Sequence, residues 1–256
     1  MMNRIKLLGL LPILLLSSCS LYNDYVYNDE GYAPLSDYSL DLTNIKNLDL
    51  NWVGGYISIY QDPEATPSIS ETRSEYPLYY KIDNDTLSIK FVRPHLPTRI
   101  LNTLSKDLYI YLPLTFSSLR VEAVSSSIYM RAVEIDEGSF DLVNTPLNAY
   151  YYVANKTRID AVSSEVNFSP LVCYKNDESA YLEHKVDINA IQSSIGLGFA
   201  KDCGYIVSWD GIRCTYYSDY NNQKEYGNKL VKVDFEGVKS TLNMNVCLYL
   251  DEGEYY

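Results

Sequence analysis

A ten-residue pattern recurs in this chain, and its central copies are separated by a constant step. Three copies begin at Val121, Phe140 and Ile159, so the two steps between successive starts are equal. Each copy has an apolar, an acidic, a small or apolar residue and valine, then three polar or turn-forming residues, then an apolar–any–apolar triplet. A fixed period of this length indicates a repeat architecture. It constrains the fold more than any other feature of the sequence.

Three looser copies lie outside this region and begin at Leu50, Ile188 and Phe235. Positions four, eight and ten are apolar in all six copies. The last two copies begin later than the constant step would place them, which predicts insertions before each of them. A run of ordinary β-hairpins with similar turns is the alternative, but hairpins do not require a constant step.

The physical chemistry of one copy predicts a strand, a corner and a second strand. Apolar and polar residues alternate over residues 119–123, as in a half-buried strand. The small residues Ser125–Ser127 favour a corner, and Ile128–Met130 resumes the alternation. A single unit cannot bury its apolar edge, whereas stacked units bury it and satisfy the backbone. The sequence therefore predicts an all-β fold, a β-solenoid of about 19-residue repeats, with a right-handed β-helix as its expected form.

Residues 1–18 are predicted to be a targeting segment. A short basic region with Arg4 and Lys6 precedes the apolar run Leu7–Leu16, which is too short for a membrane span. The segment Leu16–Cys19 resembles the bacterial lipobox. This resemblance implies cleavage before Cys19 and a diacylglycerol on its thiol, and hence lipid anchoring in the cell envelope, at the outer membrane or the cell surface. A plain secretory signal with an incidental cysteine is the alternative.

The rest of the chain is predicted to form one acidic domain. Removal of residues 1–18 leaves 19 basic and 33 acidic side chains, a formal net charge of −14, which argues against nucleic acid as a partner. Residues 19–40 are predicted to be a tether, and 41–250 the domain. Its N-terminal part should contain a hairpin about Asp83–Asp85. Insertions are expected at about 169–185 and 200–230, the second with a hairpin turn at Asp210–Gly211.

The cysteines predict disulfides. Besides Cys19, the exported chain contains an even number of them, which suggests two disulfides with three possible pairings. These are Cys173, Cys203, Cys214 and Cys247. Free buried thiols are the alternative.

Catalysis has little support in the sequence, and no catalytic residue, metal or cofactor is expected. His95 and His184 are the two histidines, which argues against a metal cluster or a histidine-based triad. The Ser-Ser corners lack the context of a nucleophile elbow. The acidic residues Glu134, Asp136 and Glu137 fit a solvated loop better than a calcium site.

One enzymatic hypothesis remains open. The second residues of the repeats should stack in a ladder on one sheet face, where carbohydrate-active β-helix enzymes place their acids. They are Glu122, Asp141, Asp160, Asn189 and Glu236. Stacked like charges are costly, so these side chains are more readily explained as solvated or bound to corners.

Tyrosine is the outlier of the composition, with 26 of 256 residues. We expect a platform for sugar rings or a protein partner at two clusters, because tyrosine offers contact area at low entropic cost. The candidates are Tyr150, Tyr151, Tyr152, Tyr216 and Tyr217. Cross-strand aromatic packing is the alternative.

The chain also resembles a known family. Leu48–Tyr60 with its Gly-Gly pair, Leu87–Phe91, Leu108–Pro113 and the Ser-Ser corners at 125, 163 and 193 are similar to the bacterial adhesin-like domains of unknown function, which include autotransporter-head-like domains on lipoproteins. The resemblance covers roughly residues 41–200 and the copy at Phe235. Its usual Ser-Gly corner is mostly Ser-Ser here.

This resemblance implies a β-helical stack on the envelope without established catalytic residues. The predicted function is therefore adhesion or other ligand binding, to a glycan or a surface protein, by a lipid-anchored, non-catalytic envelope protein. A carbohydrate-active lyase or hydrolase and a structural envelope component without a ligand are the alternatives.

Overall fold

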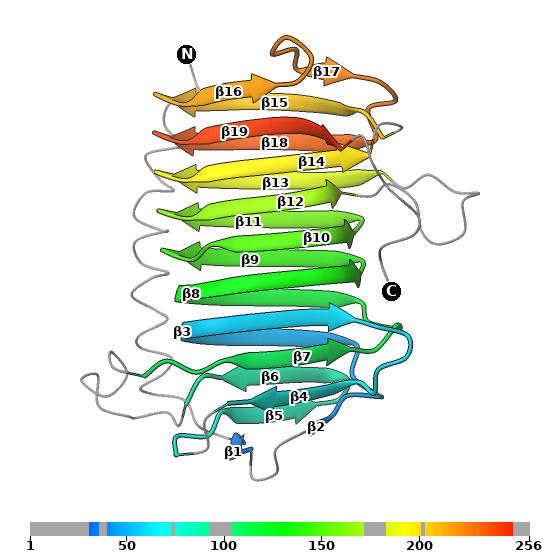
Figure 1. Cartoon of the computed structure of the whole chain (residues 1–256), viewed down its shortest axis with the longest axis vertical. Helices are drawn as coiled ribbons and strands as arrows, with labels where there is room; N and C mark the ends of the chain where they lie inside the picture. Colours follow the sequence, from blue (N-terminus) through cyan, green and yellow to red (C-terminus); the bar gives the residue numbers. More distant parts are fainter. Residues whose placement is uncertain are drawn as a thin grey trace.

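Figure 1 shows a computed structural model that describes residues 31–35, 40–72, 75–92, 104–171, 183–200 and 203–247. Nineteen strands in these ranges belong to one hydrogen-bonded sheet. The same ranges contain no helix with the length and hydropathy of a membrane span. The all-β prediction is confirmed.

The strands have the following bounds: β1 (Ala33–Pro34), β2 (Leu40–Asp41), β3 (Asn47–Gln61), β4 (Ser68–Glu71), β5 (Tyr79–Asp83), β6 (Thr86–Lys90), β7 (Leu108–Leu112), β8 (Ser118–Glu134), β9 (Glu137–Val143), β10 (Leu147–Val153), β11 (Lys156–Val162), β12 (Glu165–Leu171), β13 (His184–Ile191), β14 (Ser194–Ala200), β15 (Tyr205–Ile212), β16 (Thr215–Ser218), β17 (Glu225–Tyr226), β18 (Val231–Val238) and β19 (Thr241–Cys247).

The repeat sets the pairing of the strands. Two strands joined by a corner form what we call a rung, and Figure 1 shows the rungs stacked along the long axis of the molecule. Val121 pairs with Phe140, and Phe140 with Ile159, in parallel register. Ile159 continues the series to Ile188, and Ile188 to Phe235. Equivalent positions of the sequence pattern therefore lie opposite one another.

The interior of the stack is formed by the apolar positions of the pattern. Val121, Ala123, Ile128 and Met130 are at most 1% exposed, as the alternation predicts. Aromatic rings of neighbouring rungs meet edge to face there, as Phe140 of β9 does with Phe168 of β12. The two strands of each rung thus share one apolar core.

Each corner combines a left-handed residue with a buried hydroxyl. Position five of the pattern has a positive φ, for example 49° at Asn144 and 51° at Ser163. Position six accepts a backbone N–H from the neighbouring rung: Ser126 N donates to Thr145 Oγ1 at 3.2 Å, and Thr145 N to Ser164 Oγ at 3.0 Å. The Ser164 hydroxyl donates in turn to Val162 O at 3.0 Å. These hydroxyls satisfy buried backbone groups where the sheet ladder is interrupted.

The rungs do not follow one another in chain order at the two ends. At the end of the stack formed by the first strands of the chain, β3 lies between β8 on one side and β6 and β7 on the other. Near the other end, β18 and β19 lie between β13 and β14 on one side and β15 and β16 on the other. At the first of these ends the chain runs from β3 outward to β6 and β7 and then crosses back past β3 to β8. At the other end it runs from β14 outward to β15 and β16 and then returns to place β18 and β19 in the gap.

This arrangement corrects one expectation. Residues 205–218 form the outermost rung rather than a loop, and Asp210–Gly211 lies inside β15 instead of forming a hairpin turn. The reason is that the segment is a further copy of the pattern, with Trp209 opposite Phe235 and Tyr216 opposite Leu242. Parallel pairing with β18 outweighs the local turn preference.

The N-terminal end is antiparallel. β5 and β6 form the predicted hairpin, with Asp83 opposite Thr86 and a φ of 56° at Asn84. β1 pairs with β5, β2 with β4, and β4 with β7, all antiparallel. These short strands occupy the edge that a parallel stack leaves open.

Candidate functional site

The stack has two outer sheet faces with different chemistry. The first strands of the rungs carry acidic and basic residues on their outward positions, and we call this surface the charged face. The second strands carry mainly Tyr, Ser, Asn and Gly, and we call this surface the tyrosine face. It is formed by β7, β10, β12, β14, β16, β19 and the second halves of β3 and β8.

The predicted ladder is present on the charged face. Glu122, Asp141, Asp160, Asn189 and Glu236 pair in direct succession across five strands. Arg158 Nη2 lies 2.6 Å from Asp160 Oδ2, and Asn189 Nδ2 donates to Asp160 Oδ1 at 2.6 Å. Arg120 pairs with Glu122 and lies 3.9 Å from Asp141 Oδ2. Arginines thus offset part of the repulsion within the ladder.

Asp141 is the perturbed carboxyl of this ladder. Partial burial, the neighbouring Asp160 and the nearby Glu122 raise the pKa of Asp141 to about 7, while Arg120 opposes the change. Asp141 therefore keeps its proton to a higher pH than an ordinary carboxyl and shares a hydrogen bond with Asp160. A carboxylic acid beside a carboxylate is chemically able to donate and accept protons.

The tyrosine face contains a row of four rings from four strands. Tyr60 is stacked on Tyr111 at a centroid distance of 5.5 Å and an interplanar angle of 24°. Tyr129 lies 5.9 Å from Tyr60 and 5.4 Å from Tyr150, with tilts of 51° and 39°. Because the planes are tilted, the rings do not fully cover one another. We call Tyr111, Tyr60, Tyr129 and Tyr150 the tyrosine row.

Two further tyrosines and a serine extend this row. Burial raises the pKa of the Tyr56 hydroxyl, and the nearby Tyr60, Tyr129 and Tyr109 raise it further. Ser58 is 1% exposed and donates to Tyr60 Oη at 3.1 Å, so it lies beneath the rings. Tyr150 is 44% exposed. The row is thus supported from below and open to solvent at the Tyr150 end.

The structure separates the tyrosines that the sequence groups together. A φ of 55° at Tyr151, matched by 53° at Ala132 on the neighbouring strand, breaks the alternation, while Tyr150 pairs with Arg131 and Tyr152 with Val133. Tyr150 therefore points outward, whereas Tyr152 is fully buried and accepts a hydrogen bond from Thr157. The expectation that residues 150–152 form one platform is wrong for Tyr152.

The other predicted cluster lies at the far end of the stack. Tyr217 is 54% exposed on the same face, but β12, β14 and β19 separate it from the tyrosine row. Tyr216 turns inward, meets Trp209 edge to face, and donates to Gln223 O at 2.7 Å. Tyr60, Tyr111 and Tyr129 were not predicted. Their outward position in the pattern is the signal that could have found them.

The cysteines depart from the expected two disulfides. Cys203 is disulfide-bonded, whereas Cys214 and Cys247 are free thiols. Cys214 lies at the corner position that has a hydroxyl in the other rungs, and its Sγ accepts the Ser240 N–H at 3.3 Å. Cys247 lies at the end of β19, beside the Ser169 hydroxyl of β12. Of the alternative of free buried thiols, the first part applies to these two residues, which are free but half-buried. Cys19, Cys173 and His95 lie outside the described residues.

No metal centre is formed in the part of the chain that the structure describes, where no three His, Cys, Asp or Glu side chains gather. Of the residues considered for calcium, Asp136 accepts a hydrogen bond from Asn155 Nδ2 at 3.2 Å, and Glu137 pairs with Lys156 in the sheet. Glu134 N donates to Gln61 Oε1 at 2.7 Å.

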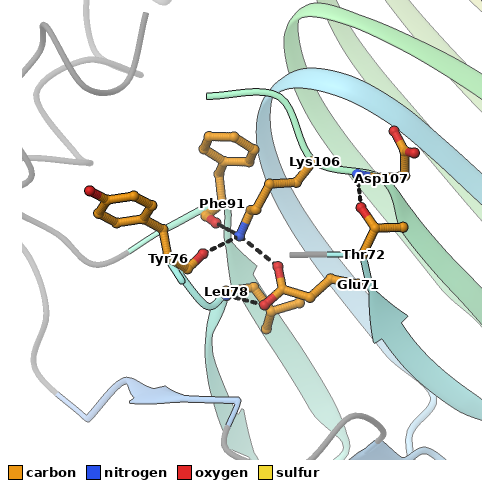
Figure 2. A network of polar contacts seen from close by, with 7 residues as sticks. All are labelled: Glu71, Thr72, Tyr76, Leu78, Phe91, Lys106 and Asp107. Carbon is orange, nitrogen blue, oxygen red and sulfur yellow. Dashed lines mark hydrogen bonds and ion pairs between the residues drawn. The ribbon is translucent and has the colours of Figure 1, made fainter. Parts of the chain in front are cut away.

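A buried lysine ties the N-terminal end together (Figure 2). Lys106 Nζ donates to Glu71 Oε2 at 2.6 Å, to Tyr76 O at 2.9 Å and to Phe91 O. Its side chain is fully buried, which lowers the lysine pKa, while Glu71 acts in the opposite direction. The backbone of Lys106 also explains why the corner of β3 has glycine at position 55, because a Cβ there would lie 1.9 Å from Lys106 O. This network satisfies its own groups and is structural.

A second buried polar group lies inside the stack. His184 is fully buried at the start of β13, and its Nε2 lies 2.8 Å from Thr157 Oγ1. Its Nδ1 has no hydrogen-bond partner among the described residues. Burial lowers the pKa of His184 to about 4, so the ring is neutral at pH 7.

Comparisons with known proteins give a structural likeness only. No family model and no curated protein sequence matches the chain. Among solved structures, it is similar to a Clostridium sporogenes protein described as a "putative cell adhesion protein". The identity is 10% and the TM-score 0.48, and the match covers 84% of this chain and 98% of the other. The function is therefore argued from the residues of this chain.

Proposed function

We propose that this chain is a lipid-anchored, non-catalytic envelope protein whose β-solenoid, of the expected right-handed form, mediates adhesion by binding a ligand on the tyrosine face. The observation that carries the proposal is the segregation of residue types between the two outer faces. Charged residues gather on one face, and the other presents the tyrosine row.

The charged face is suited to solvation. Its acids and bases alternate along the strands, as in the pairs Arg120–Glu122 and Lys185–Asp187. Exposed ion pairs of this kind contribute little to stability but keep a sheet face soluble and resistant to edge or face association. Solubility explains the charged residues of the first face but not the aromatic rings of the tyrosine face. A binding role explains these rings better.

The tyrosine face has the composition of a recognition surface. Tyr, Ser, Asn and Gly are the residues that antibody binding sites use, because rigid rings supply area and short polar groups supply adaptable hydrogen bonds. Here the rings come from a regular sheet that holds their spacing. A rigid surface binds with a smaller entropic cost than a flexible loop.

The envelope location is supported by the N-terminal sequence. The lipobox-like Leu16–Cys19 would place the lipid at Cys19, and residues 19–40 would separate it from the stack. The in-register pairing of rungs supports a solenoid as the fold. Incorporation of labelled fatty acid into the wild type, but not into Cys19→Ala, tests the anchor. Equal labelling of both would refute it.

Ligand binding is tested with the full-length chain in detergent on an array of glycans and matrix proteins. A double variant, Tyr60→Ser with Tyr129→Ser, alters the tyrosine face, and Arg158→Ser with Lys185→Ser is the matched control on the charged face. Saturable binding that is lost only in the tyrosine variant supports the proposal. Binding lost only in the control, or no binding at all, contradicts it.

A carbohydrate-active enzyme is the second candidate, and the proton-sharing pair Asp141 and Asp160 favours it. The same array distinguishes the two, because an enzyme releases shortened glycan. Release that is abolished by Asp141→Asn would replace the binding proposal with catalysis at the charged face.

A further inference from the structure

We propose that the ligand of the tyrosine face is an uncharged polysaccharide chain that lies along the stack axis, across the strands. This inference rests on the proposed function and names the class of its ligand. It follows from the charge, the geometry and the polar groups of the face.

The charge of the face excludes ionic recognition. Two columns of outward positions run along it: one contains Tyr109, Ser58, Tyr129, Asn148, Asn167, Gly196, Asn243 and Tyr217, and the other Tyr111, Tyr60, Arg131, Tyr150, Ser169, Gly198 and Asn245. Arg131 is the one charged side chain in these columns. An anionic polymer needs several cations at the contact, and the net charge of −12 repels it further. A cationic polymer meets one carboxylate beside these columns, that of Glu165, whose Oε1 already accepts from Asn167 Nδ2 at 3.3 Å, and a single carboxylate does not supply the several contacts it needs.

The geometry favours a long, thin ligand. Successive rings of the tyrosine row lie 5.4–5.9 Å apart, close to the separation of neighbouring strands. The row therefore repeats along the stack with the period of the sheet. A polysaccharide consists of repeated sugar rings, each with an apolar C–H surface. Successive sugar rings could therefore contact successive tyrosines of the row.

The polar groups between and beyond the rings suit hydroxyls. Asn148 follows the row on β10, and Asn167 Nδ2 donates to Asn148 Oδ1 at 3.3 Å. Side-chain amides both donate and accept, as sugar hydroxyls do. Beyond them, Gly196 and Gly198 leave two outward positions of β14 without side chains, and Asn167 and Cys247 lie over these positions. The amides are thus placed to bind hydroxyls of a chain that continues past Tyr150.

A protein partner fits these observations less well. Tight protein interfaces use apolar anchors in fully desolvated pockets, surrounded by a polar rim. The tyrosine row instead lies on a sheet surface, with the amides and serines directly beside it. We therefore assign the face to a polysaccharide, and protein binding becomes an outcome of the test.

The test uses the full-length chain in detergent with three sets of probes: neutral polysaccharides such as β-glucan, xylan and mannan; anionic ones such as alginate and heparin; and matrix proteins. The variants follow from the columns. Tyr129→Ser and Tyr60→Ser place serine where Ser58 and Ser169 already stand in the same columns. Tyr217→Ser, in the same column but far from the row, is the matched control.

We expect saturable binding of a neutral polysaccharide that the Tyr60→Ser, Tyr129→Ser double variant weakens about tenfold or more, since two ring contacts are lost. Tyr217→Ser should retain wild-type affinity. Affinity should rise with oligosaccharide length until the chain covers the row. Circular dichroism and thermal unfolding confirm that each variant is folded.

A measurement on the wild type keeps the inference falsifiable if the double variant does not fold. Binding of an uncharged chain should not change with ionic strength. Marked weakening of the binding by added salt would refute the inference.

The remaining outcomes separate this inference from the proposed function. If the face binds only anionic polysaccharides or proteins, and the double variant abolishes that binding, the ligand class is wrong while the binding function stands. If a neutral polysaccharide binds equally to wild type and double variant, the face is not its site. If no probe binds, the proposed function fails as well.

Discussion

The burial of His184 makes a quantitative prediction about stability and pH. The unfolded chain titrates this ring near pH 6.5, whereas burial lowers the folded pKa to about 4. Between these values the unfolded chain binds a proton that the folded chain does not, so the free energy of unfolding rises with pH in this window. The separation of the two pKa values corresponds to about 3 kcal/mol. This is a large part of the stability of a typical domain.

The assay is urea unfolding followed by circular dichroism at several pH values between 4 and 7. His184→Leu removes the titrating ring, and Thr157 keeps its hydrogen bond to Tyr152 Oη. From pH 4 to pH 7 the free energy of unfolding should therefore rise by about 3 kcal/mol less in the variant than in the wild type.

Both proteins should carry Asp141→Asn, because Asp141 titrates in the same range with the opposite sign. Its folded pKa is raised to about 7 from 3.8, so the stability it contributes is complete at low pH and is lost as pH rises through this range. With that carboxyl removed, the comparison isolates His184. Equal pH dependence in the two proteins would show that His184 is hydrated or paired in the folded state, and the reasoning from burial would be wrong.

Three further predictions concern the end and the corners of the stack, each measured by urea or thermal unfolding. Lys106→Met leaves Glu71 without its ion pair and should cost about 3–5 kcal/mol, most of which Glu71→Gln in the same chain should restore; a loss below about 1 kcal/mol would mean that the pair is hydrated. Ser164→Ala leaves the Thr145 N–H without an acceptor and should cost about 1–3 kcal/mol, so an unchanged midpoint would contradict the role of the corner hydroxyls. Gly55→Ala should prevent folding or cost more than about 4 kcal/mol, because its φ is 78° and the new Cβ would meet Lys106 O; normal stability would show that the corner can shift.

The middle of the fold could be predicted from the sequence because its information is local. A constant step places Phe140 beside Val121 and Ile159, and the alternation within each copy separates core from surface. The second residue of each copy was expected in a ladder, and the structure has it there. In this region one short pattern, repeated, determines both pairing and burial.

The ends could not be predicted, because their order depends on pairing between distant residues. Leu50 pairs with Val121, and Ile188 with Phe235, as the six copies predict, but the chain between the members of each pair forms an outermost rung, β6 with β7 and β15 with β16. The row of tyrosines was missed for the same reason, since its members come from four strands and meet only in this register. Tyr152 was misplaced because one left-handed residue reverses the alternation after Tyr150.

The return of the chain at both ends has a consequence for how the molecule folds. Each central rung pairs with the next copy along the chain, so these rungs can form a nucleus at a small loop-closure cost and at an early stage. β3 must instead pair with the distant β8 on one side and with β6 and β7 on the other, and β18 with β19 joins β13 and β14 to β15 and β16 in the same way. A simple array lengthens or frays one unit at a time. Here each outermost rung is attached to the stack through the rung beneath it, which is also the one with the distant pairing, so we expect these two rungs to unfold together as one unit.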